Sequence, residues 1–434
     1  MKNKFSKLVI AVALSASLLA TGLCGCQQEV KENRVSNSDD LLASVQKSDT
    51  APTYDFNSDT EKPESYDNYI KKSCDLGINL LRGEDYKNKN TIVAPIAVSS
   101  SLSALANGTS KDTLKELKGV LGKSSYTNEV INQCNAFITQ RLGFLNTDTT
   151  GVYNISSLWV KSDYSPKRSF LQKYDNFYED VFAYKANFAS SNINEVIKNF
   201  SFDNTKEIIS PKCIATKEDY SLYLDSSVAV SDNWLIPYDE NSVAQGSFTT
   251  ADGKAINVNY LTSVEKSFTT DKVKGFVKDL GNTPCKMVFV MPNEDITLDK
   301  YVSQLNAEKF LSLMQDMKPT NFVNAKIPEF SISEGASIKE NLQNVGVSDI
   351  FKESADFTKG FTEKAFVNDF TQSATITVNQ KGVTFNGTAN DTETEGVSQQ
   401  ANVDLIINRP FLYAVVDNDS YAPIIIGTVN NPQA

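Results

Sequence analysis

Two short patterns in this sequence contain the residue types of serine acyl-transfer chemistry. Ser44 and Lys47 in "SVQK" have the spacing of a nucleophilic serine and its activating lysine, and "SDN" at residues 231–233 matches a second element of that chemistry. The third element, Lys-Thr-Gly or Lys-Ser-Gly, does not occur in the chain. Ser44 also lies in a polar stretch where nothing holds the required geometry, so we interpret both patterns as chance matches.

The chain contains no histidine, which removes several other kinds of catalytic site. Serine and cysteine nucleophiles activated by histidine, histidine general bases and HExxH zinc sites are all excluded. The pattern "DND" at residues 417–419 lacks the glycine and the distal glutamate of a calcium loop in register, and no glycine-rich phosphate loop appears. We therefore expect no catalytic residues, no metal site and no cofactor, and we predict that the protein is not an enzyme.

Composition limits the classes of partner. The formal net charge is −11 and no basic cluster stands out, so we do not expect nucleic acid as a partner, because binding to phosphates rests mainly on Lys and Arg. Hydrophobic residues make up 40% of the 434 residues, enough for one large domain or two ordinary ones.

The first residues have the features of an export signal. Three lysines precede an apolar stretch at residues 8–20, which is short for a membrane-spanning helix. The following "LCGC" resembles the lipoprotein box of bacteria, in which cleavage before Cys26 leaves that cysteine for lipid attachment. Ordinary signal cleavage, or modification of Cys24, are the alternatives. We expect residues 1–25 to be a lipoprotein signal peptide and the protein to be secreted and held on the bacterial cell surface through Cys26.

The next segment, residues 26–65, is polar, and we predict a flexible tether there. Residues 66–434 carry a nearly unbroken pattern of helices and strands without an internal repeat, so we predict a single domain. Its four cysteines are scattered and contain no CxxC pair, which favours single buried thiols over a disulfide framework: Cys74, Cys134, Cys213 and Cys285.

The domain has an α+β pattern. Helical periods dominate its first part: Pro95 begins one expected helix and Gly108 ends it, and further helices are expected near residues 110–121 and 128–144. Strands and helices then mix, with a continuous apolar strand at 285–292 and a helix at 298–317. The last third alternates strands and turns, so helices come early and sheet comes late.

A long polar stretch interrupts this late sheet. About twenty residues separate the strand that begins at Ala374 from the strand that ends at Phe411, and structureless segments of that length are usually functional or disordered. Its first half alternates, with Val383, Phe385, Gly387 and Ala389 on one parity and polar residues on the other. Period two is the signature of a strand with one buried face.

Several motifs resemble the serpin family. "IINRPFLYAV" resembles its C-terminal signature, with Asn408, Arg409, Pro410 and Phe411 at the Asn-Arg-Pro-Phe positions. "FTTADGKAINVNYL", "IPEFSIS" and "SIKENLQNVGVSDIF" resemble further family strands and a helix, and "NTIVAPIAVSSSLSALANG" resembles the early strand and helix. Trp234 stands where the family has a tryptophan. The matches run in order from about residue 66 to residue 432.

The resemblance implies a fold and a mechanism. The fold has three β-sheets, about nine helices and an exposed reactive-centre loop, here at about residues 380–403. A protease cleaves this loop, which then inserts into the main sheet and traps the protease as a covalent complex. The hinge that starts the insertion corresponds to the following residues: Gln380, Lys381, Gly382, Val383, Thr384 and Phe385. The implied partner is a serine protease, or a cysteine protease, and we expect the inhibitor to be a monomer.

The loop departs from the family pattern. Phe385 is bulky where inhibitory members carry small residues, and Gln380 replaces the usual hinge acid. Counting from the hinge places the reactive bond at the following residues: Gly396, Val397 and Ser398. No Lys or Arg occurs between Lys381 and Arg409, which favours an elastase-like or subtilisin-like protease, with Glu395 and a Glu-specific protease as the alternative. A non-inhibitory binding or structural protein of the cell envelope is the alternative function.

Overall fold

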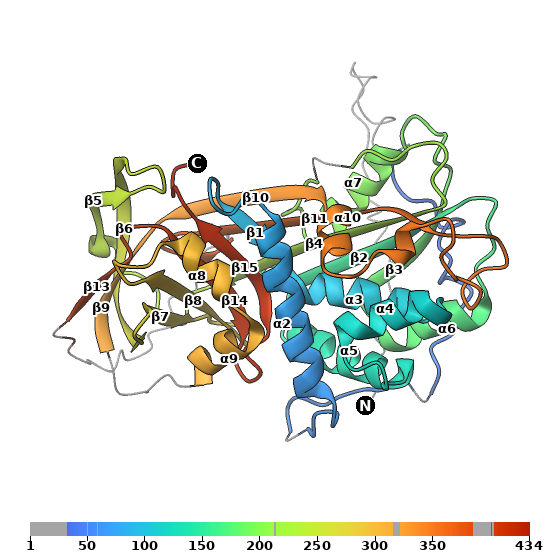
Figure 1. The fold of residues 1–434 in the computed structure, drawn as a ribbon, viewed down its shortest axis with the longest axis horizontal. Coiled ribbons are helices and arrows are strands. Elements are labelled where there is room, and N and C mark those ends of the chain that lie inside the picture. Colours follow the sequence, from blue (N-terminus) through green and yellow to red (C-terminus); the bar gives the residue numbers. More distant parts are fainter. Residues whose placement is uncertain are drawn as a thin grey trace, which may run out of the picture.

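The computed structural model describes residues 33–49, 51–58, 60–211, 214–315, 322–384, 401 and 403–434. Within these residues there are nine α-helices and fifteen strands, arranged with most helices before most strands (Figure 1). The α+β prediction and the expected number of helices are therefore confirmed. The helices are α2 (Tyr66–Gly83), α3 (Pro95–Ala106), α4 (Lys111–Leu121), α5 (Asn128–Gly143), α6 (Arg168–Phe177), α7 (Ile193–Asn204), α8 (Leu298–Gln304), α9 (Ala307–Gln315) and α10 (Lys339–Asn344).

One sheet has six strands. In spatial order they are β10 (Phe330–Ser337), β11 (Val367–Val378), β12 (Gly382–Val383), β4 (Leu222–Asn233), β2 (Gly151–Lys161) and β3 (Val181–Ala186). Strand β12 covers only one end of this sheet. Over the rest of their length β11 and β4 pair directly with each other, in parallel, whereas β10 is antiparallel to β11 and β2 is antiparallel to β4.

The other sheet has nine strands. Eight follow one another in space as β1 (Thr91–Val93), β15 (Pro423–Val429), β14 (Phe411–Asp417), β8 (Cys285–Pro292), β7 (Val273–Asp279), β6 (Ala255–Thr269), β9 (Phe322–Pro328) and β13 (Asp404–Ile406), and β5 (Val243–Thr249) pairs with β6. The third sheet expected from the resemblance is continuous with this one, because the long β6 carries β5 and β9 as well as β7.

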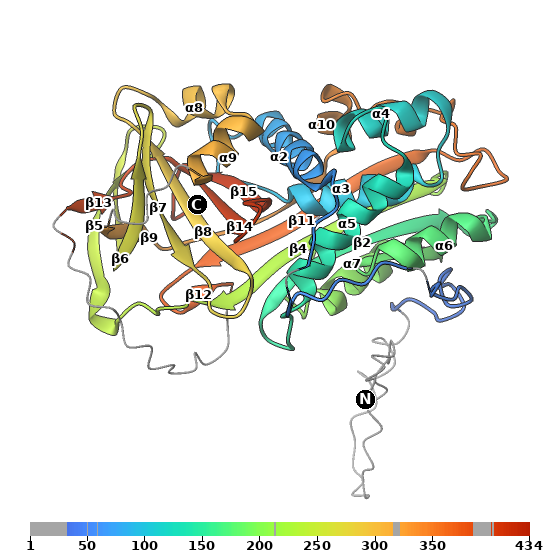
Figure 2. The same ribbon diagram turned by 90° about the horizontal axis from the view of Figure 1, so that it is seen from below.

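Helices cover both faces of the six-stranded sheet. Helix α3 lies against its inner face, and every residue of α3 is buried. Helix α7 crosses the outer face, where Ile197 and Phe200 pack in a separate apolar cluster with Trp159 of β2 and Tyr223 of β4 (Figure 2). Strand β4 is consequently buried on both faces, although its sequence alternates like a half-buried strand.

Several local signals have the predicted effect. Pro95 is at the first position of α3, where the missing N–H has no helical partner to lose. Thr127 caps α5, since its side chain accepts a hydrogen bond from the Val130 N–H. Gly346, which follows α10, has φ +93°, a left-handed conformation that glycine adopts without steric cost.

The segment before α2 does not behave as a flexible tether throughout. Its backbone pairs with the edge strand β3: the Leu41 N–H donates to the Ala183 carbonyl (3.0 Å) and the Lys185 N–H donates to the Asp39 carbonyl (2.8 Å). Leu42 is buried there. The segment docks there because the sheet edge offers unpaired backbone groups, and Leu41, Leu42 and Val45 add apolar contacts with the core. This docking contradicts a flexible tether at these residues, whereas Cys26 and the signal peptide lie outside the described residues.

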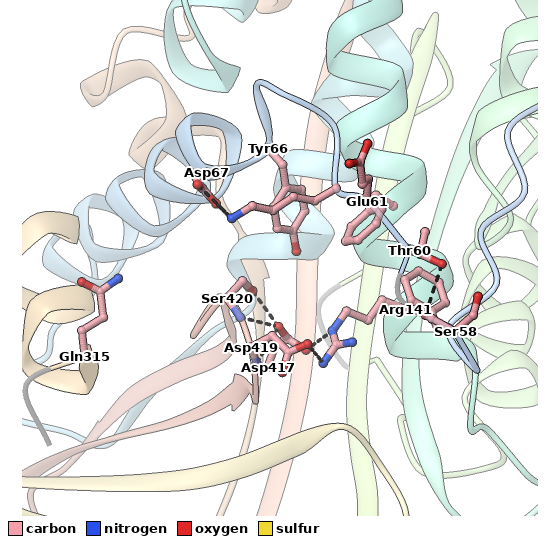
Figure 3. Close-up of a pocket in the computed structure, with 13 residues that line it drawn as sticks. Ser58, Thr60, Glu61, Tyr66, Asp67, Arg141, Gln315, Asp417, Asp419 and Ser420 are labelled. Carbon is pink, nitrogen blue, oxygen red and sulfur yellow. Dashed lines mark hydrogen bonds and ion pairs between the residues drawn. The ribbon is translucent and has the colours of Figure 1, made fainter. Parts of the chain in front are cut away.

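Further along, the same segment packs on α5 and covers a buried ion pair. The rings of Tyr54 and Phe56 lie 5.0 and 5.3 Å from the ring of Phe137. Beneath them Arg141 Nε contacts the fully buried Asp417 carboxylate at 2.6 Å (Figure 3). The first helices are thus tied both to this segment and to the turn between β14 and β15.

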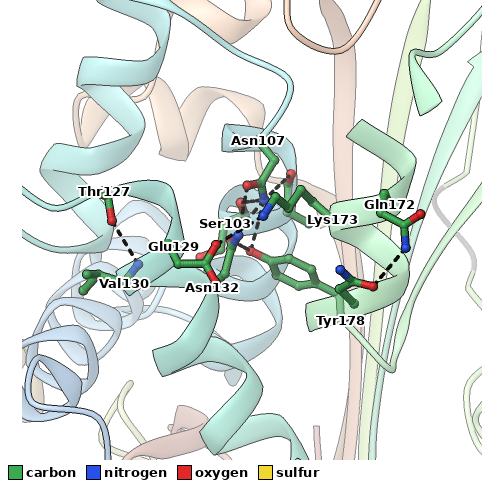
Figure 4. Close-up of polar contacts among 11 residues, drawn as sticks. Ser103, Asn107, Thr127, Glu129, Val130, Asn132, Gln172, Lys173 and Tyr178 are labelled. Atoms are coloured by element: carbon green, nitrogen blue, oxygen red, sulfur yellow. Dashed lines mark hydrogen bonds and ion pairs between the residues drawn. The ribbon is translucent and has the colours of Figure 1, made fainter. Parts of the chain in front are cut away.

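Side-chain amides join α3, α5 and α6. Asn107, which follows α3, exchanges two hydrogen bonds of 3.0 Å with Asn132 of α5, and the Tyr178 hydroxyl donates to Asn132 at 2.6 Å (Figure 4). Lys173 of α6 pairs with Glu129 of α5 at 3.2 Å. These contacts hold the helices as one layer against the six-stranded sheet.

Two other sequence predictions have outcomes here. The helix expected at residues 298–317 is two helices, α8 and α9, separated at Leu305. Cys74, Cys134 and Cys285 are buried single thiols, as predicted, and Cys213 lies outside the described residues. Over the described part of the chain, no cluster of three His, Cys, Asp or Glu side chains could hold a metal ion, and none of the helices there has the length and apolar character to cross a membrane.

Candidate functional site: the hinge and the sheet seam

The structure describes five of the six predicted hinge residues and none of the reactive-bond residues. Gln380 to Thr384 connect β11 to the start of the loop and lie at one end of the six-stranded sheet. Phe385, Gly396, Val397 and Ser398 lie outside the described residues. The described part of the site is therefore the entry point of the loop.

The hinge already occupies a place inside the sheet. Gly382 and Val383 form β12, which lies between β11 and β4 and is antiparallel to both. Val383 is opposite Val378 of β11 and opposite Asp232 of β4, and its side chain is fully buried in the main core. The first alternating residue of the loop thus has the buried position that its parity predicted.

The turn from β11 into β12 is held by hydrogen bonds. The Asn379 side-chain oxygen accepts from the N–H groups of Lys381 (2.8 Å) and Gly382 (3.2 Å). Trp234 holds the turn from the β4 side, because its indole N–H donates to the Asn379 carbonyl (2.9 Å) and its backbone N–H donates to the Lys381 carbonyl (3.2 Å). Trp234 itself packs edge-on against Tyr238 and contacts the ammonium group of the buried Lys278.

Gly382 is required by a close approach. A Cβ atom at this position would lie 2.0 Å from the Asp232 carbonyl oxygen. No real Cβ contact is that short, so any larger residue must push β12 away from β4. Asp232 cannot yield easily, because its carboxylate accepts hydrogen bonds from the Thr283 N–H (2.7 Å) and the Thr283 hydroxyl (2.8 Å).

Thr384 marks the point where the chain leaves the sheet. Its φ is +49°, an unfavourable conformation for a β-branched residue. Two hydrogen bonds to Thr377 of β11 hold it there: the Thr384 N–H donates to the Thr377 carbonyl (2.7 Å), and the Thr377 N–H donates to the Thr384 hydroxyl (3.1 Å). Extension of β12 by one residue requires this strained conformation to become extended.

Beyond β12 the two neighbouring strands close on each other along a line that we call the seam. The seam is the parallel pairing of β11 with β4, from Val367 opposite Leu222 to Thr375 opposite Ala229. Within the seam Thr371 is opposite Asp225, and at β12 Val378 and Asp232 face Val383 from its two sides. The two pairs are separated by the same number of residues in the sequence, so β11 and β4 keep one register at both places. A strand that extended β12 could therefore continue between β11 and β4 without a change of register.

Polar side chains line the seam, and sequence reasoning overlooked most of them. Gln372 of β11 accepts a hydrogen bond from the Ala94 N–H (3.0 Å), ahead of α3. The Ser226 hydroxyl of β4 is buried without a hydrogen-bond partner among the described residues. Asp225, next to it, is also buried. The signal was in the sequence, since "LDSS" and "TQS" place runs of polar residues in the middle of two strands.

The loop re-enters the fold at the edge of the other sheet. Strand β13 runs parallel to β9, and Lys326 contacts the Asp404 carboxylate at 3.3 Å. The family-signature residues follow directly and are structural. The Asn408 carbonyl accepts from the Thr249 N–H (2.9 Å), and Arg409 donates to the Pro292 carbonyl (2.7 Å).

The last residue of the signature anchors β14. Phe411 is fully buried among aromatic rings of other strands, with ring centroids 5.8 Å from Phe330 and 6.4 Å from Phe289. Pro410 precedes it at the start of the strand, where a missing N–H is tolerated. The two ends of the loop thus differ: one lies in the middle of a sheet and the other at a sheet edge.

Comparisons with known proteins agree with this geometry. A family model described as "Serpin (serine protease inhibitor)" matches residues 71–432. The "Intracellular coagulation inhibitor 2" of Tachypleus tridentatus is 24% identical over 387 residues, which cover 84% of this chain and 91% of that protein. The "Serine protease inhibitor" of Cyanea capillata is 23% identical over 80% of this chain and 93% of its own length.

Solved structures show the same fold. The native state of the thermophilic serpin tengpin superimposes with a TM-score of 0.79 at 24% identity, over 90% of this chain and 99% of tengpin. Human thyroxine-binding globulin in its hormone-bound form gives a TM-score of 0.75 at 18% identity, over 84% of this chain and 99% of the globulin. These identities are low, so the structural likeness concerns the fold alone.

Proposed function

The chain belongs to the serpin family, and we propose that it inhibits serine proteases as a suicide substrate. In this mechanism the protease serine attacks the carbonyl carbon of the reactive bond, so the part of the loop before that bond becomes an acyl ester of the protease and the residue after it leaves as a free amine. The freed strand then enters the six-stranded sheet with the protease attached. The observation that supports the proposal is β12, which lies between β11 and β4 in the register that a longer strand requires.

A strand that kept this register would place Phe385 on the inner face. Phe385 would lie between Ile376 of β11 and Val230 of β4, both fully buried in the main core. A large side chain added to a packed core destabilises it by about 1–3 kcal/mol. Phe385 therefore opposes the second step of insertion, after Val383.

Further along, the same register would place a carboxylate in the core. Asp391 would lie between Phe370 and Leu224, both buried and apolar. An unpaired carboxylate in such surroundings is unfavourable, so insertion past this point should slow or require protonation of Asp391. Rapid inhibition needs insertion to outpace hydrolysis of the acyl-enzyme, so these two residues set the efficiency of the inhibitor.

We propose that the target is an elastase-like or subtilisin-like serine protease. The loop has no Lys or Arg after Lys381 and no aromatic residue between Phe385 and Phe411, which disfavours trypsin-like and chymotrypsin-like enzymes. The bond after Val397 combines a small branched residue with Ser398. Cleavage after Glu395 by a Glu-specific protease, and capture of a cysteine protease, are the alternatives.

We also propose that the protein works at a bacterial membrane surface. The support is in the sequence: a basic and apolar leader ends in the "LCGC" box, where Cys26 would receive the lipid. Metabolic labelling with a fatty acid, compared between the natural chain and Cys26→Ser, tests this. Label that persists in Cys26→Ser would contradict it.

The inhibitory function is tested by mixing the domain with an elastase-like protease and separating the products on a denaturing gel. We expect a new band at the summed mass that resists detergent, because the trapped acyl-enzyme is covalent. Cleavage of the loop without this band, across elastase-like and subtilisin-like proteases, would contradict suicide inhibition.

Two matched variants connect the gel result to the hinge. Val383→Asp puts a carboxylate at a fully buried position of β12, whereas Lys381→Asp puts the same group at an exposed position of the adjacent turn. We expect Val383→Asp to be cleaved without forming the complex and Lys381→Asp to form it. Equal behaviour of the two variants would mean that β12 is not the entry point.

A non-inhibitory binding protein is the second candidate. Phe385 and Asp391 favour it, because both would meet the apolar face of the sheet on insertion. The similarity to thyroxine-binding globulin is compatible with it but extends only to the fold. The gel separates the two candidates, since a binding protein gives cleaved loop and no complex.

A further inference from the structure

Asp225 is a carboxylate buried in the middle of the six-stranded sheet. Asp225 lies on β4 within the seam, opposite Thr371 of β11, and only 1% of its surface is exposed. Its side chain is on the outer face, beneath α7. Buried carboxylates are rare unless a cation or several hydrogen-bond donors compensate them, so its surroundings decide what it can do.

Hydroxyl groups from three elements meet this carboxylate. Thr371 donates to it across the seam from β11 (2.8 Å), and Ser201 donates to it from α7 (2.6 Å). Ser227, two residues along β4, lies at 3.5 Å. The Tyr223 and Thr371 hydroxyl oxygens are 2.5 Å apart. Because Thr371 has one proton and gives it to Asp225, Tyr223 is the donor to Thr371. The Asp225 carboxylate of β4 thus links β11 and α7 through hydrogen bonds.

No charged side chain of the described residues faces Asp225. The residue opposite it on β2 is Ser157. The charged groups on the elements around it are engaged elsewhere: Glu195 with Lys198, Asp203 with Arg34, Lys161 with Asp163, Asp369 with Ser337, and Asp232 of the same strand with Thr283. Burial without a cation raises the pKa of Asp225 to about 6, and the hydrogen bonds from Ser201, Thr371 and Ser227 keep it from rising further.

From this arrangement we infer that the protonation of Asp225 controls how easily the seam between β11 and β4 opens. The inference deepens the proposed function, on which it rests, because the loop strand must pass through this seam. When β11 and β4 separate, Asp225 loses the Thr371 hydroxyl, and water or the incoming strand can reach it. An open seam therefore accommodates the ionised carboxylate better than the closed seam does.

The direction of the pH dependence follows from proton linkage. The closed seam holds the proton more tightly than the open seam, so protonation favours the closed sheet. Seam opening becomes easier as the pH rises through about 6, where the buried carboxyl loses its proton. The opening equilibrium should increase about tenfold for each unit by which the pKa falls on opening. Mild acid thus keeps the sheet closed, and neutral pH releases it.

Hydrogen–deuterium exchange of the uncleaved protein measures seam opening directly and without a protease. Peptides from β11 and β4 would be followed between pH 5 and pH 8, with correction for the intrinsic exchange rate. We expect their opening to rise with pH, whereas peptides from β15, in the other sheet, stay constant. A flat profile for β11 and β4 would overturn the inference.

Three variants separate protonation from packing. Asp225→Asn mimics the protonated group, and we expect slow opening at every pH. Thr371→Val removes a hydrogen bond that lowers the pKa, so the midpoint of the profile should move to higher pH. The matched control is Thr375→Val, the same exchange four residues along β11, and it should keep the natural midpoint. An unchanged profile in Asp225→Asn, or equal midpoints in the two threonine variants, would contradict the inference.

The rate of loop insertion, followed by tryptophan fluorescence, provides a second test. The chain has two tryptophans: Trp159 packs 5.8 Å from Phe200 of α7, and Trp234 bonds to the hinge turn. After rapid loop cleavage by excess protease, their fluorescence change should be slower at pH 5 than at pH 7.5, except in Asp225→Asn. Complete absence of a change would count against the proposed function, whereas a change with the same rate at both pH values would count against the role of Asp225 alone.

Discussion

The two sheets of this molecule differ in the side chains of their buried strands. In the nine-stranded sheet, β14 and β15 are buried at every position and mostly carry aromatic and branched apolar side chains. In the six-stranded sheet, the central strands β4 and β11 are also largely buried but include buried Asp225, Ser226, Ser227, Thr371 and Gln372. Both pairs of strands are interior, yet β14 and β15 are mostly apolar, with Asp417 and Thr428 as buried polar exceptions, whereas β4 and β11 carry a run of polar residues in mid-strand.

If the protein works by loop insertion, as proposed, this difference explains why the six-stranded sheet is the one that opens. Separating two apolar strands exposes apolar surface to water, which costs a free energy of about 25 cal/mol per Å². Separating strands that carry hydroxyl groups costs less, because these groups form new hydrogen bonds with water or with an entering strand. Parallel pairs such as β11 with β4 are also slightly less stable per residue than antiparallel ones. The nine-stranded sheet is then the fixed scaffold, and the seam is the movable part.

The largest expected effect comes from damage to the scaffold. Phe289→Ala empties a fully buried site beside Phe276 and Phe411, and it should lower the free energy of unfolding by about 3–5 kcal/mol. Because the scaffold does not change on insertion, denaturant unfolding should show equal losses in the intact and loop-cleaved proteins. Phe144→Ala, at a 40% exposed position, is the control and should change little. A loss of stability in only the intact or only the cleaved protein would mean that the nine-stranded sheet also changes on insertion, which contradicts its role as a fixed scaffold.

The next effect concerns the open end of the seam. Gly382→Ala forces β12 away from β4, and we expect a loss of about 3 kcal/mol, the upper range for overpacking. The loop should then be cleaved without trapping the protease, as a gel would show. Gly119→Ala, in an exposed stretch of α4 with no atom near the new Cβ, is the matched control and should be neutral or stabilising. Normal trapping by Gly382→Ala would contradict the role of β12.

A smaller effect should sharpen the comparison. Phe385→Ala removes the bulk that would meet Ile376 and Val230, so the cleaved protein should gain about 1–3 kcal/mol relative to the intact one. More protease should be trapped per molecule of inhibitor, measured by titration of residual protease activity. Asn386→Ala, on the opposite parity, serves as the control. An equal gain from both variants would mean that the inserted strand does not keep the register of β12.

The smallest effect should arise at the far end of the loop. Lys326 and Asp404 form a partly exposed ion pair at the sheet edge, and such pairs contribute about 0–1 kcal/mol. The stability of Lys326→Ala should therefore lie within about 1 kcal/mol of that of the natural chain, and this variant should trap protease normally. A large loss of trapping would show that the end of the loop at β13 also takes part in insertion.

Much of the scaffold could be predicted from the sequence, because its signals are local. Pro95 starts α3, and an unbroken apolar run marks β8. The docking of the segment before α2 could not be predicted, because Leu42 and Tyr54 stand in a mostly polar stretch and the surfaces that this stretch contacts are more than eighty residues away in the sequence. The sequence of a polar segment does not show whether a distant part of the fold binds it.

The candidate site was predictable in part. The alternation that begins at Val383 indicated a strand with one buried face, and the structure confirms its first residue. The polar seam escaped sequence analysis because polar residues in a strand, such as Asp225 and Gln372, do not by themselves show that they are buried. Their meaning depends on the pairing of β4 with β11, which are more than a hundred residues apart in the chain.

Thermal unfolding before and after loop cleavage tests the central claim most directly. The domain would be cut within the loop by brief exposure to an elastase-like protease, the cut located by mass spectrometry, and both forms heated under identical conditions. We predict a large rise in the unfolding temperature after cleavage, because the freed strand enters the seam and completes the six-stranded sheet. An unchanged unfolding temperature would mean that the strand stays outside, and the seam would then have no part in the function of this protein.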